Sequence, residues 1–125
     1  MPKKQRSPCP LANALDIVGD KWSLLVIRDL SLGATTYSEL QQAPEGIPTN
    51  ILADRLKRLQ AQGIIEKQAY QQHPPRYSYH LTDKGNGLRP VLLEMVKWGL
   101  EYVPGTSLPE AVARKTGIKR QSRRP

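Results

Sequence analysis

The side chains of residues 49–58 could hydrogen-bond to DNA bases and pair with phosphates. Asn50 carries an amide that both donates and accepts, which suits adenine, and Thr49 offers a hydroxyl and a methyl group. Lys57 and Arg58 follow later in the segment and are cations suited to phosphate oxygens. The candidates for base edges are Thr49, Asn50, Ala53 and Asp54. The chemistry indicated is recognition of double-stranded DNA, and an ordinary solvated helix face is the alternative.

The positions of the leucines predict that residues 48–62 form one helix, ended by Gly63. At about 100° per residue, Leu52, Leu56 and Leu59 fall in a narrow sector. The residues that fall opposite them are Asn50, Asp54, Lys57 and Ala61. We therefore expect one face to pack on a core while the other, polar and cationic face stays accessible.

A two-stranded ribbon is predicted directly after this helix, with strands over 64–70 and 76–82 and a loop over 71–75. Along the second strand Tyr77, Tyr79 and Leu81 point one way, and Ser78 and His80 the other. Arg76, next to the two prolines of the loop, is the natural residue to reach a DNA backbone or minor groove. In a plain hairpin, Arg76 would be one more surface charge.

The uneven distribution of charge supports a nucleic-acid partner more than the total does. The 125 residues carry a formal net charge of +8, yet residues 9–103 hold ten basic and ten acidic side chains. The excess lies in the termini, with Lys3, Lys4 and Arg6 at one end and Lys119, Arg120, Arg123 and Arg124 near the other. Within the central part, the basic residues gather over 47–80 and are Arg55, Lys57, Arg58, Lys67 and Arg76. This asymmetry predicts that the helix and ribbon face DNA, and it adds Arg55 to the candidate contacts.

Five further helices are predicted around this unit. A first helix opens at Pro10 and ends at Gly19; a second follows Asp20 as its N-cap and stops at Gly33. A capping box from Thr36 to Glu39 starts a third helix that runs to about Ala43. Thr82 caps a fifth helix that continues to Trp98 and bends at Pro90. Ser107 to Glu110 forms a second capping box, so a short helix is expected near 108–116.

Catalysis, cofactors and metals have little support in the sequence. The two histidines lack the cysteine or carboxylate spacing of a metal site, and no phosphate-binding glycine loop or Gly-x-Ser-x-Gly motif is present. We therefore expect a protein that is not an enzyme and needs neither metal nor cofactor. The longest apolar run, 24–27, is far shorter than a membrane span, and the charged N-terminus has no apolar region after it. A single cysteine fits a reducing cytosol, so a cytoplasmic protein with no membrane partner is expected.

The single cysteine, Cys9, is the residue best suited to redox chemistry. It stands just ahead of the first helix, whose dipole lowers a thiol pKa, and Arg6 is close in sequence. Cys9 is therefore a candidate sensor of oxidants or electrophiles. The alternative is a small, partly buried residue at a subunit interface. Because no second cysteine exists, only an intersubunit disulfide or a mixed-thiol cap is available to it.

The sequence resembles HxlR-type transcriptional regulators, which are relatives of the MarR group. The resemblance covers roughly residues 9–100 and is carried by Cys9-Pro10, Gly19–Trp22, Tyr37–Leu40, Leu52–Leu59, Gly63–Ile65, Pro74–Thr82 and Trp98-Gly99. It implies a dimeric bacterial winged-helix regulator in which the first and fifth helices form the interface. Two positions depart from the pattern: Thr36 stands where a basic residue is common, and Pro48 where serine is usual. Thr36 is retained as a candidate phosphate contact.

These expectations define a mainly α fold with a small β-hairpin, a winged helix-turn-helix. Residues 1–8 form a flexible basic arm, 9–103 the DNA-binding and dimerisation domain, and 104–125 a basic, partly disordered extension. The expected function is a transcriptional regulator that binds a palindromic operator as a homodimer, with no effector indicated. The expected dimer interface consists of Leu11, Leu15, Leu88, Val91, Leu92, Met95 and Trp98. The alternatives are a thiol-based sensor working through Cys9, and a winged-helix protein-interaction module with nonspecific nucleic-acid binding.

Overall fold

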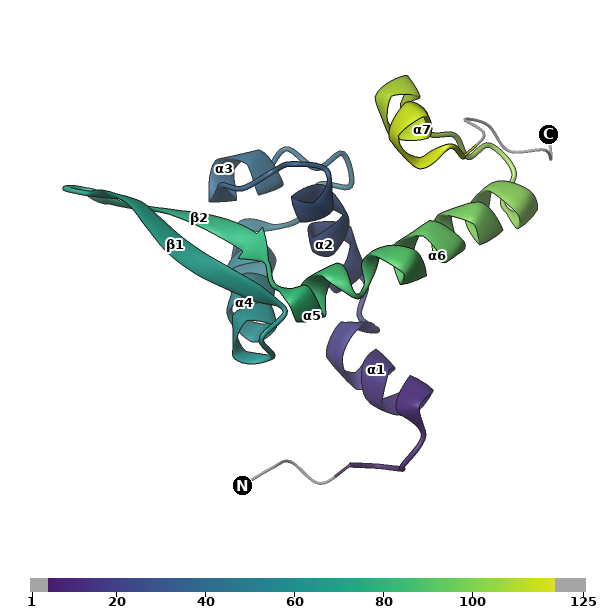
Figure 1. Cartoon of the computed structure of the whole chain (residues 1–125), viewed down its shortest axis with the longest axis horizontal. Helices are drawn as coiled ribbons and strands as arrows, with labels where there is room; N and C mark the ends of the chain where they lie inside the picture. Colours follow the sequence, from purple (N-terminus) through teal and green to yellow (C-terminus); the bar gives the residue numbers. More distant parts are fainter. Residues whose placement is uncertain (1–4, 119–125) are drawn as a thin grey trace. The chain divides into compact units, whose positions relative to one another are not determined.

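The computed structural model describes residues 5–118, which form seven helices and one hairpin within that range (Figure 1). In chain order they are α1 (Pro10–Val18), α2 (Ser23–Ser31), α3 (Tyr37–Leu40), α4 (Thr49–Ala61), β1 (Ile65–Gln72), β2 (Pro75–Leu81), α5 (Asp83–Asn86), α6 (Arg89–Tyr102) and α7 (Glu110–Thr116). The chain divides into two compact units, the first ending at Asn86 and the second beginning at Gly87. The prediction of a mainly helical fold with one hairpin is confirmed. The predicted arm residues Lys3 and Lys4 and the tail 119–125 lie outside the described residues.

The core of the first unit is built from α2, α3, α4 and the base of the hairpin. α2 contacts α3, α4 and β2, while α4 also contacts β1. The side chains that these elements bury are Val26, Ile27, Leu30, Leu40, Ile47, Leu52, Leu56, Leu59, Ile64 and Ile65. The leucine sector predicted for the fourth helix is thus its buried face, which leaves the opposite face for other contacts.

The helix pair α3–α4 begins and ends much as its capping residues predict. Thr36 Oγ1 accepts from the Glu39 amide at 3.2 Å, and the Glu39 carboxylate accepts from the Thr36 amide at 3.0 Å, so the capping box is confirmed. α3 is shorter than expected, because it ends at Leu40 instead of near Ala43. α4 starts with Pro48 as its N-cap and ends before Gly63, whose φ of 72° is readily adopted only by glycine.

The hairpin is longer, and its turn tighter, than the sequence predicts. The antiparallel ladder runs from Ile65↔Leu81 to Gln72↔Pro75, with an irregularity at Tyr70. The expected loop over 71–75 is therefore wrong, since only residues 73–74 lie outside the strands. Gln71 Nε2 donates to the Pro74 carbonyl at 3.0 Å across the turn, a local contact that strand propensity does not report. Figure 1 shows the ribbon projecting from the helices α2–α4.

The helix expected from Thr82 to Trp98 is two helices, so the prediction of one helix bent at Pro90 is wrong. Thr82 Oγ1 accepts from the Gly85 amide at 3.2 Å and caps α5 as expected. α5 ends at Asn86, and Pro90 lies in the first turn of α6. A proline there replaces an amide that would have no helical partner, whereas within a helix it clashes with the carbonyl four residues earlier. Gly85 is required, because a Cβ at this position would lie 2.2 Å from the Ile64 carbonyl oxygen.

The second unit consists of α6 and α7. Thr106 Oγ1 donates to the Val103 carbonyl at 2.8 Å and closes the end of α6. α7 forms within the predicted range, but Pro109 is its N-cap and no side chain caps it, so the capping box expected at Ser107 is absent. Gly117, with φ of 71°, ends α7. None of the helices within residues 5–118 combines the length and apolar character needed to cross a membrane.

Candidate nucleic-acid interface

The outward face of α4 carries the predicted contact residues. Thr49, Asn50, Ala53, Lys57 and Arg58 are exposed, and Asp54 is half-exposed. The buried leucines fix the helix from the opposite side, so this face is presented by a rigid element. Its amino end has no side-chain cap, which leaves the first-turn amides available to an anion.

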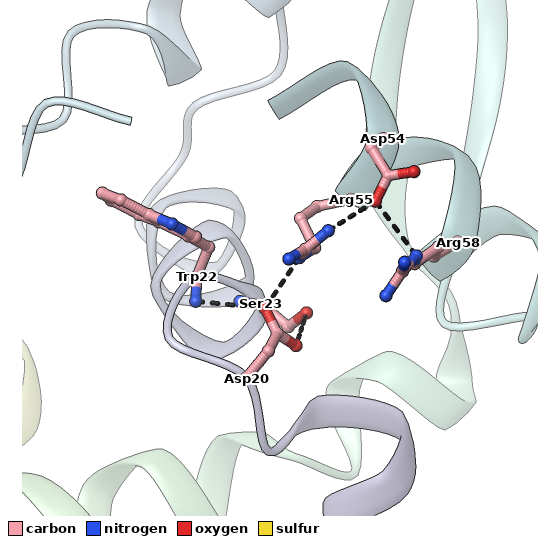
Figure 2. A network of polar contacts seen from close by, with 6 residues as sticks. All are labelled: Asp20, Trp22, Ser23, Asp54, Arg55 and Arg58. Carbon is pink, nitrogen blue, oxygen red and sulfur yellow. Dashed lines mark hydrogen bonds and ion pairs between the residues drawn. The ribbon is translucent and has the colours of Figure 1, made fainter. Parts of the chain in front are cut away.

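Arg55 differs from its predicted place at the DNA surface. Its side chain is only 15% exposed, and its Nε donates to Asp20 Oδ2 at 2.7 Å (Figure 2). A second guanidinium nitrogen, Nη1, contacts the carboxylate of Asp54. Since two carboxylates already hold this cation, a phosphate would have to displace one of them. We therefore assign Arg55 to positioning α4 and leave it out of the proposed contacts.

Asp20 joins the start of α2 to α4. Its carboxylate accepts from the Trp22 and Ser23 amides, both at 3.1 Å, and from Ser23 Oγ at 2.5 Å. These hydrogen bonds confirm the prediction that the Asp20 side chain caps this helix. The helix itself begins at Ser23, so Trp22 occupies the N-cap position. Burial alone would raise the pKa of Asp20, but the hydrogen bonds from Ser23, Arg55 and the two amides outweigh it and lower the pKa to about 2.

Asp54 lies between two arginines on the same helix (Figure 2). Its Oδ2 atom contacts Arg55 Nη1 and lies 3.0 Å from Arg58 Nε, one turn further along α4. The Arg58 side chain is 67% exposed, so it is accessible to an anion while it contacts Asp54. Asp54 is thus a paired carboxylate in the middle of the outward face.

The N-cap of α3, Thr36, and its first residue, Tyr37, fix the geometry of the helix pair. Thr36 uses its hydroxyl in the capping box with Glu39, so a phosphate would compete with that arrangement. Tyr37 donates its hydroxyl to the Thr49 backbone carbonyl at 2.7 Å, which joins α3 to the first residue of α4. Sequence analysis missed this role of Tyr37. In the sequence, Tyr37 stands out only as part of the motif Tyr37–Leu40, and that motif does not indicate a hydrogen bond to Thr49.

The hairpin is fastened at its base and carries two basic side chains, Lys67 and Arg76, against one acidic side chain, Glu66. The Tyr79 amide in β2 donates to the Thr35 carbonyl at 2.7 Å, which connects the ribbon to the segment before α3. Lys67 Nζ lies 4.1 Å from the centre of the Tyr77 ring, a cation–π contact that sequence analysis did not identify. Arg76 is exposed and pairs across the ladder with Gln71 near the tip.

Cys9 is exposed and stands at the N-cap position of α1. Its amide donates to Ser7 Oγ at 3.2 Å, and its carbonyl accepts from the Asn13 side chain at 2.8 Å. Arg6, which is close to Cys9 in sequence, pairs with another residue: its Nε donates to Asp16 Oδ1 at 2.9 Å.

Several of the predicted interface residues are exposed apolar side chains. On α1 these are Leu11 and Leu15. On α6 the exposed apolar residues include Val91, Met95, Trp98 and Tyr102, with Leu93 exposed elsewhere on the helix. Their spacing of four, three and four residues places them on one stripe. Leu88 and Leu92, also predicted, are half-buried. Tyr102 was missed, although its position four residues after Trp98 is a helical signal; the two rings lie 5.5 Å apart.

The fold and this surface together define a class of protein. A helix pair followed by a hairpin, with an exposed polar face on the second helix, is a winged helix-turn-helix, the architecture of DNA-binding transcription regulators. Within residues 5–118, no cluster of histidine, cysteine or acidic side chains is arranged to hold a metal ion.

Comparisons with known proteins identify the family. The HxlR-like helix-turn-helix family matches residues 17–107. A helix-turn-helix transcriptional regulator of Synechocystis sp. is 38% identical over 95 residues, covering 76% of this chain and 70% of the relative. The crystal structure of PA1607, described as a transcription factor, superposes with a TM-score of 0.77 at 35% identity and covers 94% of this chain and 82% of its own. The oxidized form of the redox regulator HypR gives a TM-score of 0.64 at 34% identity, covering 73% and 94%. The chain belongs to the HxlR-like helix-turn-helix family.

Proposed function

We propose that this regulator binds a palindromic operator as a homodimer, with α4 in the major groove and the hairpin on the flanking backbone or minor groove. The observation that carries the proposal is the division of α4 into two faces. Leu52, Leu56 and Leu59 are almost fully buried, whereas Thr49, Asn50 and Ala53 are exposed near its amino end. In helix-turn-helix proteins this end of the second helix approaches base edges.

The proposed contacts divide by chemistry. Thr49, Asn50 and Ala53 face base edges, with the Asn50 amide suited to adenine. Lys57 and Arg58, further along α4, contact phosphates, and Arg76 extends the basic surface onto the ribbon. The uncapped first-turn amides of α4 add backbone donors for one more phosphate.

A dimer explains the apolar stripe of α6 and the exposed leucines of α1. The Trp98 side chain is 62% exposed and Leu11 is 66% exposed, which is unusual for large apolar side chains of a small domain. A second copy of the chain could cover each of these two sets, since a twofold contact uses the same residues on both subunits. The two recognition helices would then address half-sites about 34 Å apart, or a multiple of that.

Discrimination between duplexes tests this proposal. An operator selected from random duplexes and a scrambled duplex of equal length are titrated at physiological salt. We expect much tighter binding to the operator, and Asn50→Ala should reduce the preference at one base pair by about 1–3 kcal/mol. Gln60→Ala, near the other end of α4, is the matched control and should keep the preference. Equal affinity of the wild type for both duplexes would favour a protein-interaction module with nonspecific nucleic-acid binding and overturn the proposal.

A thiol switch is the second candidate function, favoured by the exposure of Cys9 and by the likeness to a redox regulator. Treatment with a disulfide-forming oxidant should change operator affinity in the wild type and leave Cys9→Ser unaffected. With one cysteine in each chain, the oxidised product should be an intersubunit disulfide or a mixed disulfide with a small thiol. Mass spectrometry separates these two products, and an unchanged affinity after full oxidation would exclude the switch.

A further inference from the structure

Asp54 occupies a position where a DNA-binding surface does not favour negative charge. It lies one turn after Asn50 and one turn before Arg58, so the three side chains form a row along the outward face of α4. A carboxylate here repels phosphates and loses hydration when the helix enters a groove. We therefore expect the complex with DNA to supply a hydrogen bond that offsets this repulsion and lost hydration.

The carboxylate of Asp54 is held through one of its two oxygens. Oδ2 contacts Arg55 Nη1 and lies 3.0 Å from Arg58 Nε, as Figure 2 shows. Arg55 is itself fixed by Asp20 at 2.7 Å, so the carboxylate is oriented by a chain of ion pairs that reaches back to α2. Among the contacts of residues 5–118, none donates to Oδ1, and the side chain is 45% exposed. An oriented acceptor therefore remains for a donor from outside the protein.

The bases differ in what they offer such an acceptor in the major groove. Cytosine presents an exocyclic amino donor, whereas guanine presents two acceptors, and thymine one acceptor and a methyl group. Adenine has an amino group, but its N7 acceptor lies beside it and repels a carboxylate. We propose that Asp54 is a specificity-determining residue that recognises cytosine, with Oδ1 accepting a hydrogen bond from the cytosine amino group. This inference rests on the proposed function, because it requires α4 to lie in the major groove.

The same geometry makes Asp54 select against other sequences. Where no cytosine amino group is in reach, the carboxylate faces acceptor atoms or phosphates and its lost hydration is not replaced. Asp54 thus weakens binding to random DNA and strengthens the preference for the operator. Specificity is the difference between these two affinities, so both effects raise it.

Selection from a library of random-sequence duplexes tests the inference. The wild type should enrich cytosine at one position of each half-site, and Asp54→Ala should lose that preference, about a 5- to 150-fold effect when the base is exchanged. Asp54→Ala should also bind random duplex more tightly than the wild type does. Glu110→Gln removes one negative charge on α7 and is the matched control for net charge; it should keep the cytosine preference. Retention of the full preference in Asp54→Ala would overturn the inference.

A modified operator gives a measurement that does not depend on how the variant folds. In this duplex the selected cytosine is replaced by 2-pyrimidinone, which lacks only the amino group. The wild type should lose the affinity assigned to that contact, and Asp54→Ala should bind both duplexes equally. If the wild type binds both equally while still preferring the operator over scrambled DNA, the inference fails and the proposed function stands. If the wild type does not prefer the operator at all, both fail.

Discussion

Arg55 Nε donates to Asp20 Oδ2 at 2.7 Å, and this ion pair joins α4 to the residue whose carboxylate caps the start of α2. The two residues are 35 positions apart in sequence. Both belong to wider sets of contacts, since Asp20 also accepts from Ser23 and Arg55 also contacts Asp54. The orientation of the outward face of α4 therefore depends on a contact made behind it.

Loss of this ion pair should destabilise the fold. Asp20→Ala leaves the Arg55 guanidinium, 15% exposed, without its principal partner and removes the acceptor at the start of α2. We expect a loss of about 2–3 kcal/mol in the free energy of unfolding, measured by chemical denaturation. Asp16→Ala is the matched control, because it breaks the exposed Arg6–Asp16 pair; it should lose no more than about 1 kcal/mol. Equal losses in the two variants would contradict a special role for Asp20.

The pKa of Asp20 predicts how this contribution depends on pH. The pKa is lowered from 3.8 to about 2 in the folded protein, so the folded state favours the ionised carboxylate. The stabilisation is fully present well above pH 4 and is lost as the pH falls from about 4 through 2. The difference in unfolding free energy between wild type and Asp20→Asn should therefore be constant near neutrality and shrink below pH 4. A difference that grew on acidification would have the wrong sign.

The place of Arg55 shows what a helical wheel predicts and what it omits. At 100° per residue, Arg55 lies only about 60° from Leu52, at the edge of the buried sector, so its inward orientation was partly visible in the sequence. Its partner was not, because no local pattern relates it to Asp20, so the charge at 55 was read as part of the basic surface. By contrast, the buried leucines and the capping box of α3 depend on spacing within one helix and were predicted correctly.

The other differences also arise from contacts between elements or from steric detail. The hairpin is longer than expected because Gln71 and Arg76 pair, which strand propensity alone does not specify. Apolar periodicity continues through residues 83–98, whereas the missing amide of Pro90 divides that segment into α5 and α6. The capping box at Ser107 failed because Pro109 takes the N-cap position of α7.

The hydrogen bond from Tyr37 should contribute to both stability and affinity. Tyr37→Phe removes the 2.7 Å bond to the Thr49 carbonyl while preserving the ring. We expect a loss of about 0.5–1.5 kcal/mol in unfolding free energy and weaker operator binding, because α3 no longer fixes the start of α4. Tyr70→Phe alters an exposed ring on the hairpin and serves as the control in denaturation, where it should be neutral. Wild-type stability and affinity in Tyr37→Phe would show that this bond does not set the helix pair.

The apolar stripe of α6 should determine the oligomeric state. Trp98→Glu places a charge among Val91, Met95 and Tyr102, and burial of an unpaired charge in a subunit contact is costly. Sedimentation equilibrium at micromolar concentration should give a dimer for the wild type and a monomer for Trp98→Glu. Lys97→Glu changes charge at the neighbouring position, about 100° away around the helix, and should remain dimeric. A monomeric wild type would remove the dimer from the proposed function.

Arg76 should contribute to affinity without contributing to base preference. It is exposed near the tip of the ribbon, and no hydrogen bond or ion pair of its side chain occurs among the described residues. A cation that contacts one phosphate releases about one counterion. Arg76→Ala should therefore weaken binding to the operator and to scrambled duplexes alike. It should also reduce the magnitude of the slope of log K against log salt by about one unit. Arg114→Ala, which removes an arginine paired with Glu110 on α7, is the matched control and should keep the wild-type slope. If Arg76→Ala keeps the wild-type affinity and slope, the hairpin does not contact DNA. If it loses affinity for the operator alone, Arg76 recognises bases or groove shape.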